Sequence, residues 1–348
     1  RSEEDTTDAR GLSCFLYDRL DNAVIVRRVE NKLGIKGAPT CELVYKNAPA
    51  QLIGDARMGL IKYVMSLMNA ARLGIGAQSV GLAEAAYRVA YKYANEREQF
   101  GKKINEFAPV YEMLASMRAK IDGIRSLLYE TARYVDMYKL YTSESKTRSL
   151  NNEERDEMKY YQRLADIYTP LLKLFASEYC NQVTYDAIQI HGGTGYMKDF
   201  PVERLYRDAR ITNIYEGTSQ LQVVAAIRGI SSGAYLKRVK EYENMTLKPE
   251  LQPLKNILLD MTARFENVID ILKERNHPEI FDFQSRRLVE MMGNIIIGYL
   301  LLQDSNRNDN YEYTARVFIR MGNAQNHERE NYIIDFTVND LAAFQTNK

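Results

Sequence analysis

The stretch VYEMLASMRAKIDGIRSLL at Val110–Leu128 carries the clearest periodic pattern in this 348-residue sequence. Its apolar side chains recur alternately after four and after three positions: Val110, Leu114, Met117, Ile121, Ile124 and Leu128. This alternation places all of them on one side of a helix and is typical of antiparallel helical bundles. The segment therefore predicts a long helix whose apolar seam packs against other helices.

Helical spacing continues on both sides of this seam. It predicts bundle helices over 59–95, 157–190 and 219–228, and Ser219 and Gln222 have the spacing of a capping box at the start of the last one. The glycine-bounded segment Gly229–Gly233 is a natural linker. Beyond it the pattern predicts further helices over Tyr235–Glu243, Leu251–Asn276, Phe281–Gln303, Tyr311–Asn323 and Glu330–Phe344.

The first 55 residues have a different character. Short runs of β-branched, aromatic and apolar residues at Gly11–Tyr17, Ala23–Arg28 and Thr40–Tyr45 are separated by turn residues, and predict three or four strands of a small open sheet. We therefore expect a mainly α protein in three parts. These are a partial β domain over 1–55, an antiparallel four-helix bundle over 56–230 and a helical extension over 231–348.

Charge and composition weigh against several classes of protein. The 47 lysines and arginines nearly balance the 46 acidic residues, so no general nucleic-acid surface is expected. Three scattered cysteines and three histidines favour neither a disulfide framework nor a metal site, and fit a reducing compartment such as the bacterial cytoplasm. The longest apolar run, Ile295–Leu302, is too short to span a bilayer, so no membrane association is expected.

Residues that could carry chemistry concentrate in two segments, since the G-x-S-x-G, P-loop and H-E-x-x-H signatures do not occur in the sequence. The first segment is REQFG at Arg97–Gly101, and the second covers residues 189–220. Gly192, Gly193 and Gly195 follow a long predicted helix. Glycine at such a place either ends the helix or lets the backbone approach a phosphate or a ring closely.

Glu216 lies just before the helix that is predicted to start near Ser219. Free N–H groups at a helix N-terminus favour negative charge, so a carboxylate at this place suits a general base. A surface glutamate that caps the helix is the more common role of such a residue. Arg97, in the same way, is compatible with a solvated charge at a helix end.

Five motifs, in order along the chain, resemble those of the acyl-CoA dehydrogenase family. They are KLGIKGAPTCEL at Lys32–Leu43, NAARLGIGAQSVGLAEAA at Asn69–Ala86, EREQFGKKI at Glu96–Ile104, AIQIHGGTGYMKDFPVERLYRDARI at Ala187–Ile211 and IYEGTSQ at Ile214–Gln220. The resemblance extends over Gly11–Arg228. The long helical extension is similar to that of the larger bacterial members, including those that act on methylthio-substituted propionyl-CoA thioesters such as 3-methylmercaptopropionyl-CoA.

This resemblance implies a flavoenzyme that binds FAD and oxidises an acyl-CoA thioester to the trans-2-enoyl-CoA. Glu216 matches the base that removes the α-proton, while the β-hydrogen leaves as hydride to the flavin N5. In some family members the base lies on the long helix, directly before an arginine. That position is Ala71 here, so it does not compete with Glu216. The implied substrate-binding residues are Arg72, Tyr215 and Gly217.

The resemblance also implies cofactor contacts, at Arg97, Gln99, Phe100, Gln189, Gly192, Gly193, Thr218 and Gln220. The first three match a motif that reaches the FAD of a neighbouring subunit, so a homodimer or homotetramer is expected. Electron-transfer flavoprotein is the expected electron acceptor. Phe107 and Ala108 depart from a His-Gln pair that is common in relatives, which puts one flavin contact in doubt.

The family's N-terminal helical domain and the first half of its β domain are not recognisable in this sequence. A tryptophan that is common near the flavin has no counterpart, because the chain contains no Trp. We therefore expect a fragment that binds FAD poorly by itself and is inactive. Flavin that co-purifies with this chain, together with turnover of an acyl-CoA, would contradict that expectation.

Two other functions stay open. A non-enzymatic relative of this fold would bind DNA or serve as an assembly module, and Arg204, Arg207 and Arg210 form a short basic strip. An acyl-CoA oxidase would pass its electrons to oxygen and release peroxide.

Overall fold

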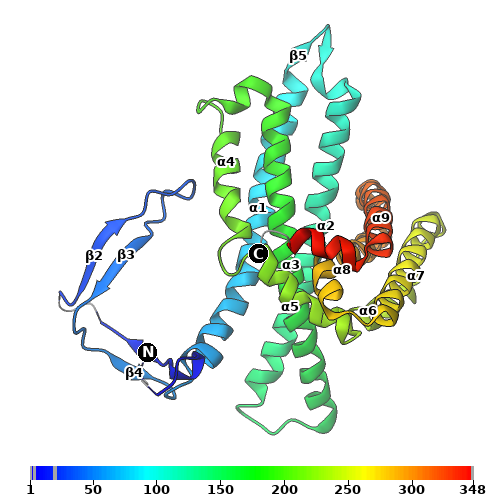
Figure 1. The fold of residues 1–348 in the computed structure, drawn as a ribbon. Coiled ribbons are helices and arrows are strands. Elements are labelled where there is room, and N and C mark those ends of the chain that lie inside the picture. The colour runs from blue at the N-terminus through cyan, green and yellow to red at the C-terminus, as the bar shows by residue number, and fades with distance from the viewer. Residues whose placement is uncertain (1, 3–4, 19–21, 346–348) are drawn as a thin grey trace. The chain divides into compact units, whose positions relative to one another are not determined.

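The structure, a computed structural model, describes residue 2 and residues 5–18 and 22–345. Helices dominate it, which confirms the predicted mainly α fold with a helical bundle and a C-terminal helical extension (Figure 1). The chain divides into two compact units, Arg1–Gly74 and Ile75–Lys348. Most of the bundle and the whole extension belong to the second unit.

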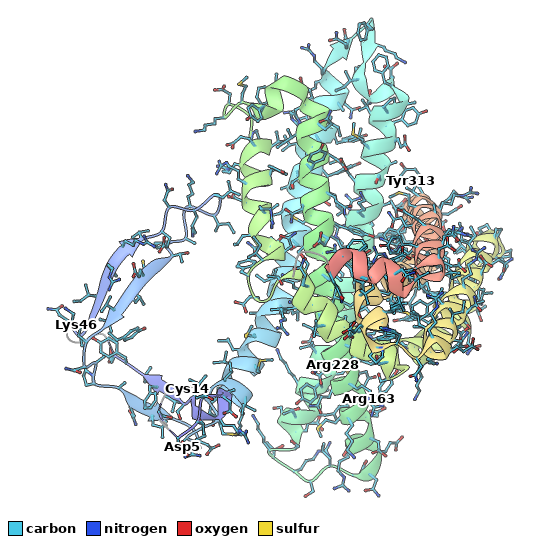
Figure 2. The ribbon with its side chains drawn as sticks, viewed as in Figure 1. Asp5, Cys14, Lys46, Arg163, Arg228 and Tyr313 are labelled. Carbon is cyan, nitrogen blue, oxygen red and sulfur yellow. The ribbon has the colours of Figure 1, made fainter. Side chains whose placement is uncertain are left out.

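The N-terminal unit contains two short antiparallel ladders. Strand β1 (Cys14–Leu16) pairs with β4 (Gln51–Ile53), and β2 (Val24–Val29) pairs with β3 (Cys41–Tyr45). The predicted strands are therefore confirmed, but the prediction of one small open sheet is wrong. Most side chains of both ladders are exposed (Figure 2), so no shared apolar layer is available to join them into one sheet.

The bundle is built from long helices that run antiparallel. They are α1 (Met65–Glu96), which follows the π-helical turn η2 (Gly59–Val64), α2 (Ala108–Glu144), α3 (Asn152–His191) and α5 (Ser219–Ser231). Small residues such as Ala86 and Ala90 of α1 share a buried core with Met117 of α2 and Val183 of α3. The predicted seam of α2 is confirmed at its centre, where the side chains are buried: Leu114, Met117, Ile121 and Ile124.

Short elements connect these helices. The hairpin of β5 (Glu98–Gln99) and β6 (Lys102–Lys103), followed by η3 (Ile104–Glu106), joins α1 to α2. The connection from α3 to α5 passes through η4 (Gly192–Tyr196), α4 (Val202–Ala209) and η5 (Arg210–Asn213). Figure 1 shows the hairpin at one end of the bundle, far from α5. The hairpin segment Arg97–Gly101 and the residues that precede α5 therefore lie at different levels of the bundle.

The extension packs directly on the bundle. It contains α6 (Ala234–Glu243), η6 (Pro249–Leu251), α7 (Gln252–Arg275), α8 (Pro278–Arg307), η7 (Asp309–Tyr311), α9 (Glu312–Asp335) and α10 (Val338–Gln345). Helix α8 is its centre, since every residue of Met291–Leu302 is buried and α8 contacts α2, α5, α7 and α9.

The single helix predicted over Glu330–Phe344 is wrong. Residues up to Asp335 continue α9, the chain becomes extended at Phe336, and α10 starts anew at Val338. The guanidinium of Arg275 donates to the carbonyls of Ile333 and Phe336 at 2.9 and 3.0 Å. These contacts from α7 satisfy the last carbonyls of α9 and so allow the helix to end there.

Gly293 lies at a close contact between α8 and α3. A Cβ at this position would lie 2.1 Å from Cε2 of Phe175. We expect Gly293→Val to lower the free energy of unfolding by about 3 kcal/mol, because the added methyl groups force the ring or the backbone to shift. Urea denaturation measures the change. Gly81→Val is the matched control, since no described atom beyond the neighbouring turns of its own helix lies within 4 Å of its Cβ position. Equal stability of Gly293→Val and the parent protein would contradict this packing.

Glu130 is the centre of an ion cluster between α2 and α6. Its carboxylate accepts hydrogen bonds from Arg133 and Arg238, each at 3.0 Å, and from the hydroxyl of Tyr242 at 2.9 Å. Burial alone would raise the pKa of Glu130, but the hydrogen bonds and charges around it, from Arg133, Tyr134 and Arg238, lower this pKa to about 2.

This lowered pKa makes the stability of the fold depend on pH. A carboxyl whose pKa is lower in the folded state stabilises the fold above its unfolded pKa, and the contribution is lost as the pH falls toward the folded pKa. We expect Glu130→Gln to be less stable than the parent by about 2 kcal/mol at pH 7, and by less than half of that near pH 3. Urea denaturation at the two pH values measures both differences. A difference that does not change with pH would refute the assignment.

Candidate active site

The loop of residues 214–218, called the Glu216 loop below, carries the predicted base into the start of α5. Glu216 has φ of 54° and Gly217 has φ of 95°, so two consecutive residues have left-handed backbone. This conformation costs a non-glycine residue such as glutamate on the order of 1 kcal/mol or more and persists only where surrounding contacts enforce it. Contacts around the loop must therefore stabilise the left-handed backbone of Glu216.

Two fully buried side chains hold the carbonyl oxygens of the loop. The ammonium of Lys173 on α3 donates to the carbonyl of Gly217 at 2.8 Å. The amide of Gln222 on α5 donates to the carbonyls of Gly217 and Glu216 at 3.0 and 3.2 Å. Both Lys173 and Gln222 are 0% exposed, and a buried polar donor needs an acceptor of this kind. These hydrogen bonds stabilise the left-handed backbone at Glu216.

Two further contacts tie the loop to the neighbouring helices. The hydroxyl of Tyr215 donates to the side chain of Gln78 on α1, and burial raises the pKa of this hydroxyl. The hydroxyl of Ser219 donates to the carboxylate of Glu178 on α3. The loop is therefore fastened to α1 and α3 on either side of Glu216.

The predicted capping box of Ser219 and Gln222 is wrong. Thr218, with extended backbone, precedes the first helical residue of α5, and its side chain makes no capping hydrogen bond. Ser219 is instead bound to Glu178, and Gln222 turns inward to the Glu216 loop. The N-terminus of α5 follows Glu216 directly in the chain, and such a helix end favours negative charge.

Glu216 itself is half-buried. Its backbone carbonyl is held by Gln222, and Glu216 lies three residues before the first helical residue of α5. A carboxylate in this setting can accept a proton from a substrate that is positioned against the loop. Tyr215, Gly217 and Thr218 are half-buried in the same loop, and Gln220 is exposed on the first turn of α5.

A second group of predicted residues lies at the hairpin. Phe100 and Gly101 form its turn with φ of 52° and 81°, the pair of positive values that a two-residue hairpin turn requires. The Phe100 side chain is 89% exposed and contacts Phe107 edge-on at a ring distance of 6.4 Å. Arg97 and Gln99 are exposed beside it. The described chain therefore leaves most of the Phe100 ring uncovered.

The glycines after α3 lie at the same end of the bundle as the hairpin. Gly192, with φ of 60°, ends α3. Gly195 is glycine for reasons of packing, since a Cβ there would lie 2.7 Å from the carbonyl of Ile188. At Gly193, in contrast, no described atom lies within 4 Å of a Cβ and φ is not left-handed. Packing within the described chain therefore does not explain Gly193, and its exposed backbone is open to a ligand.

Tyr93 connects the end of α1 to the end of α3. Its ring stacks on His191 at 4.3 Å, and its hydroxyl accepts a hydrogen bond from Thr194 at 3.2 Å. The hairpin that follows α1 is therefore near Gly192, Gly193 and the exposed Gln189.

The structure does not bring the two groups together. Lys173, which holds the Glu216 loop, and Gln189, at the hairpin end, are 16 positions apart on the same helix α3. At 1.5 Å per residue this separation is about 24 Å. The predicted site residues thus form two separate clusters within one chain. Arg72 lies half-buried on the part of α1 that belongs to the N-terminal unit.

Lys173 and Gln222 were not predicted from the sequence. Lys173 stands inside the apolar run Pro170–Ala176 (PLLKLFA), and a single lysine among core residues is the signal that could have identified it, because a buried ammonium needs a hydrogen-bond partner. For Gln222 the sequence shows a capping-box spacing, which predicts a role at the helix end and not the observed hydrogen bonds to the Glu216 loop.

Other kinds of site are not seen in the described residues. They contain no cluster of three or more His, Cys, Asp or Glu side chains that could hold a metal ion. Cys14, Cys41 and Cys180 are not joined in disulfides. In the same residues, no helix has both the length and the apolar character needed to cross a membrane.

Comparisons with known proteins agree on one family. The family model described as acyl-CoA dehydrogenase, C-terminal domain, matches residues 61–230. The model described as acyl-CoA dehydrogenase C terminal matches residues 231–341. The caffeyl-CoA reductase-Etf complex subunit CarC of Acetobacterium woodii is 34% identical over 232 residues, which are 66% of this chain and 53% of that protein. The chain spans about half the length of the curated relatives it matches.

Solved structures repeat both the bundle and the extension. Caenorhabditis elegans ACDH-11 in complex with C11-CoA has a TM-score of 0.77 at 25% identity, over 91% of this chain and 54% of that one. An acyl-CoA dehydrogenase complexed with FAD from Bacillus anthracis has a TM-score of 0.72 at 24% identity, over 96% of this chain and 61% of that one. With both family models covering consecutive parts of it, the chain belongs to the acyl-CoA dehydrogenase family.

Proposed function

We propose that the protein is a FAD-dependent acyl-CoA dehydrogenase in which Glu216 removes the α-proton of the acyl thioester. The observation that carries this proposal is the Glu216 loop, because Lys173 and Gln222 hold Glu216 in a left-handed conformation that it would not otherwise adopt. Strained backbone that buried polar side chains enforce is found preferentially at functional sites. The motif IYEGTSQ and the family membership supply the chemistry that belongs to this glutamate.

The contacts of the loop support proton abstraction. General-base catalysis requires a carboxylate fixed within hydrogen-bond reach of the acidic proton. The side chains that bind the loop and Ser219 directly after it restrict where Glu216 can lie: Gln78, Lys173, Gln222 and, through Ser219, Glu178. The bound flavin would supply the acceptor for the hydride that leaves the β-carbon.

The residues at the hairpin end fit a role in holding FAD. Arg97 offers an exposed guanidinium, which suits a pyrophosphate, and the open backbone at Gly192 and Gly193 allows close approach of a ligand. Because about 24 Å of α3 separates this cluster from the Glu216 loop, each chain would offer Arg97, Gln99 and Phe100 to the flavin of a second copy. This separation supports a homo-oligomer, at least a dimer, with shared cofactor sites.

The test is a direct assay of the intact protein. The purified protein should show flavin absorbance, and an acyl-CoA substrate should bleach it under anaerobic conditions with formation of the trans-2-enoyl-CoA. A panel of straight, branched and methylthio-substituted acyl-CoAs covers the substrates that the family resemblance suggests. Bound flavin that no acyl-CoA bleaches would refute the proposed function.

Electron-transfer flavoprotein is the proposed electron acceptor, as the name of the Acetobacterium relative contains Etf. Reduction of this partner in the presence of acyl-CoA would support the proposal. Stoichiometric peroxide in air would instead identify an acyl-CoA oxidase.

DNA binding has little support in the structure. In the basic strip, Arg207 is bound by Glu203 at 2.7 Å and Arg210 donates to the side chain of Asn213. Fluorescence anisotropy with duplex DNA at increasing salt tests this alternative, since binding through phosphates must weaken as salt rises.

A further inference from the structure

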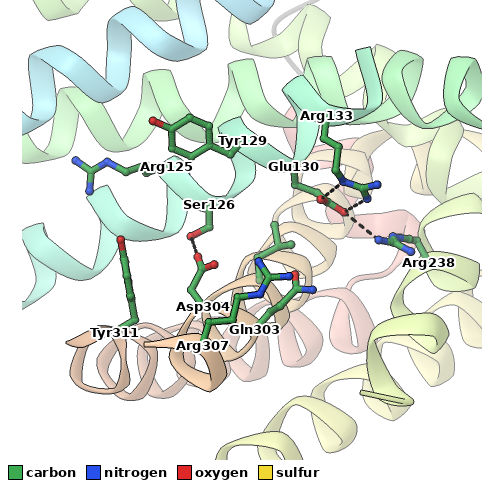
Figure 3. A pocket seen from close by; sticks show the side chains of 11 residues that line it. Arg125, Ser126, Tyr129, Glu130, Arg133, Arg238, Gln303, Asp304, Arg307 and Tyr311 are labelled. Atoms are coloured by element: carbon green, nitrogen blue, oxygen red, sulfur yellow. Dashed lines mark hydrogen bonds and ion pairs between the residues drawn. The ribbon is translucent and has the colours of Figure 1, made fainter. Parts of the chain in front are cut away.

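A cavity of about 570 Å³ lies between α2, α6 and α8 (Figure 3). None of the catalytic, cofactor-binding or substrate-binding residues that the sequence predicts lines it. Its volume is within the range of small-molecule sites, roughly 300–1,000 Å³. The side chains that line it are mostly polar and charged, with four arginines against two carboxylates. Arg125 pairs with Glu84 and Asp122 at 2.7 and 2.8 Å, and Arg133 and Arg238 pair with Glu130. The positive charge available to an anionic ligand is therefore that of Arg307.

Both carboxylates of the lining are already engaged. Glu130 accepts from Arg133 and Arg238, as described above, and the hydrogen bonds and charges of this cluster keep its pKa near 2 against the effect of burial. Asp304 on α8 accepts from the hydroxyl of Ser126 on α2 at 2.5 Å, and burial raises its pKa. Both carboxylates of the lining therefore already accept hydrogen bonds from side chains of the protein.

Donors, in contrast, remain unused. Arg307, near the end of α8, is exposed and makes no hydrogen bond or ion pair within 4.0 Å to any side chain in the described part of the chain. It presents a planar fork of N–H donors that matches the oxygens of a phosphate. Figure 3 shows Arg307 and Gln303 reaching into the cavity from α8, with Tyr129 on the α2 side and Tyr311 at the edge. The two tyrosine rings offer flat surfaces to a ring-containing ligand.

We propose that this cavity binds a small organic phosphate, with the phosphate against Arg307 and an aromatic or heteroaromatic part beside Tyr129 and Tyr311. A free phosphate ion would fill only a small part of the volume and would leave the rings uncovered. Guanidinium groups bind phosphate through paired, charge-assisted hydrogen bonds. The site is separate from the Glu216 loop and does not depend on the proposed dehydrogenase activity.

Phenyl phosphate is a suitable probe, because it combines a phosphate with an aromatic ring and lacks the adenosine part of FAD and CoA. Isothermal titration of the purified protein should show saturable binding that weakens with salt. Arg307→Ala should weaken it at least tenfold, and Tyr311→Leu should weaken it severalfold. Arg316→Ala is the matched control. Arg316 is also exposed on a helix of the extension, but it pairs with Glu312 at 2.8 Å outside the cavity.

Two results would overturn the proposal as a whole, and a third would overturn one part of it. Absence of saturable binding, or equal affinity of Arg307→Ala and the parent, would overturn the proposal. Equal affinity for inorganic phosphate and phenyl phosphate would overturn the part of it that assigns a ring to the tyrosines. Since Arg307 is exposed, its substitution is not expected to disturb folding, which circular dichroism checks. Loss of acyl-CoA activity is not part of the readout.

Discussion

In the intact protein, replacing Glu216 by glutamine should lower kcat for acyl-CoA oxidation by about a thousandfold or more while leaving FAD bound. Glutamine has nearly the same size and keeps a polar side chain beside the N-terminus of α5, but its amide cannot take up the α-proton. General-base catalysis is typically worth about 10²–10⁴ in rate. The hydrogen bonds that hold the loop go to backbone carbonyls, so the substitution leaves them in place.

Anaerobic rapid mixing with acyl-CoA measures the rate of flavin bleaching in Glu216→Gln and in the parent protein. Glu153→Gln, which changes an exposed glutamate in the first turn of α3, is the control and should react at the parental rate. Flavin absorbance after gel filtration reports whether FAD remains bound. Parental bleaching in Glu216→Gln would show that another residue is the base.

Replacing Lys173 by methionine in the intact protein should lower kcat about tenfold to a hundredfold, because the Glu216 loop loses one of the two side chains that hold its carbonyl oxygens. Small misplacements of a catalytic group are known to cost up to about 10² in rate. Methionine has a similar length and fits a buried position, and removal of a buried charge offsets part of the lost hydrogen bond. We therefore expect folding to be retained. KM for acyl-CoA should change little, since Lys173 is fully buried and binds the loop backbone.

A kinetic isotope effect separates positioning from a purely structural role. With substrate deuterated at the α-carbon, Lys173→Met should show a larger isotope effect than the parent, because proton abstraction becomes more rate-limiting. Lys255→Met is the matched control, since Lys255 also donates to a backbone carbonyl, that of Met245 at 3.1 Å, but within the extension. A fall in activity that only mirrors loss of folded protein, with an unchanged isotope effect, would contradict the positioning role.

Much of the fold could be predicted because helix periodicity is a local property. The alternation of four and three positions along 110–128 identified a buried seam, and the structure buries its centre. The helix predicted over Glu330–Phe344 failed for a reason that lies elsewhere in the chain. Arg275 on α7 takes the last carbonyls of α9, and Phe336 packs its ring on Phe283 of α8 at 4.7 Å. No pattern within residues 330–344 records these partners.

In the candidate site, too, local patterns predict some features, while contacts from other segments decide the rest. Glu216 and the hairpin residue Arg97 were identified from short motifs, but Ser219 and Gln222 were assigned to a cap that the structure does not contain. Spacing along a helix shows which side chains could reach its first turn. It does not show that Ser219 donates to Glu178 on another helix. Nor does it show that the amide of Gln222 donates to two carbonyls of the Glu216 loop.

The sequence by itself determined that the chain is mainly helical, that it carries the motifs of an acyl-CoA dehydrogenase, and that Glu216 precedes a helix. Only the tertiary structure decided that Lys173 holds the loop of Glu216, that about 24 Å of α3 separates this loop from the hairpin cluster, and that Arg307 faces a cavity. The physical reason is that periodicity and motifs report on single segments. A hydrogen bond between α3 and the Glu216 loop, or a cavity between α2, α6 and α8, exists only once those segments have packed.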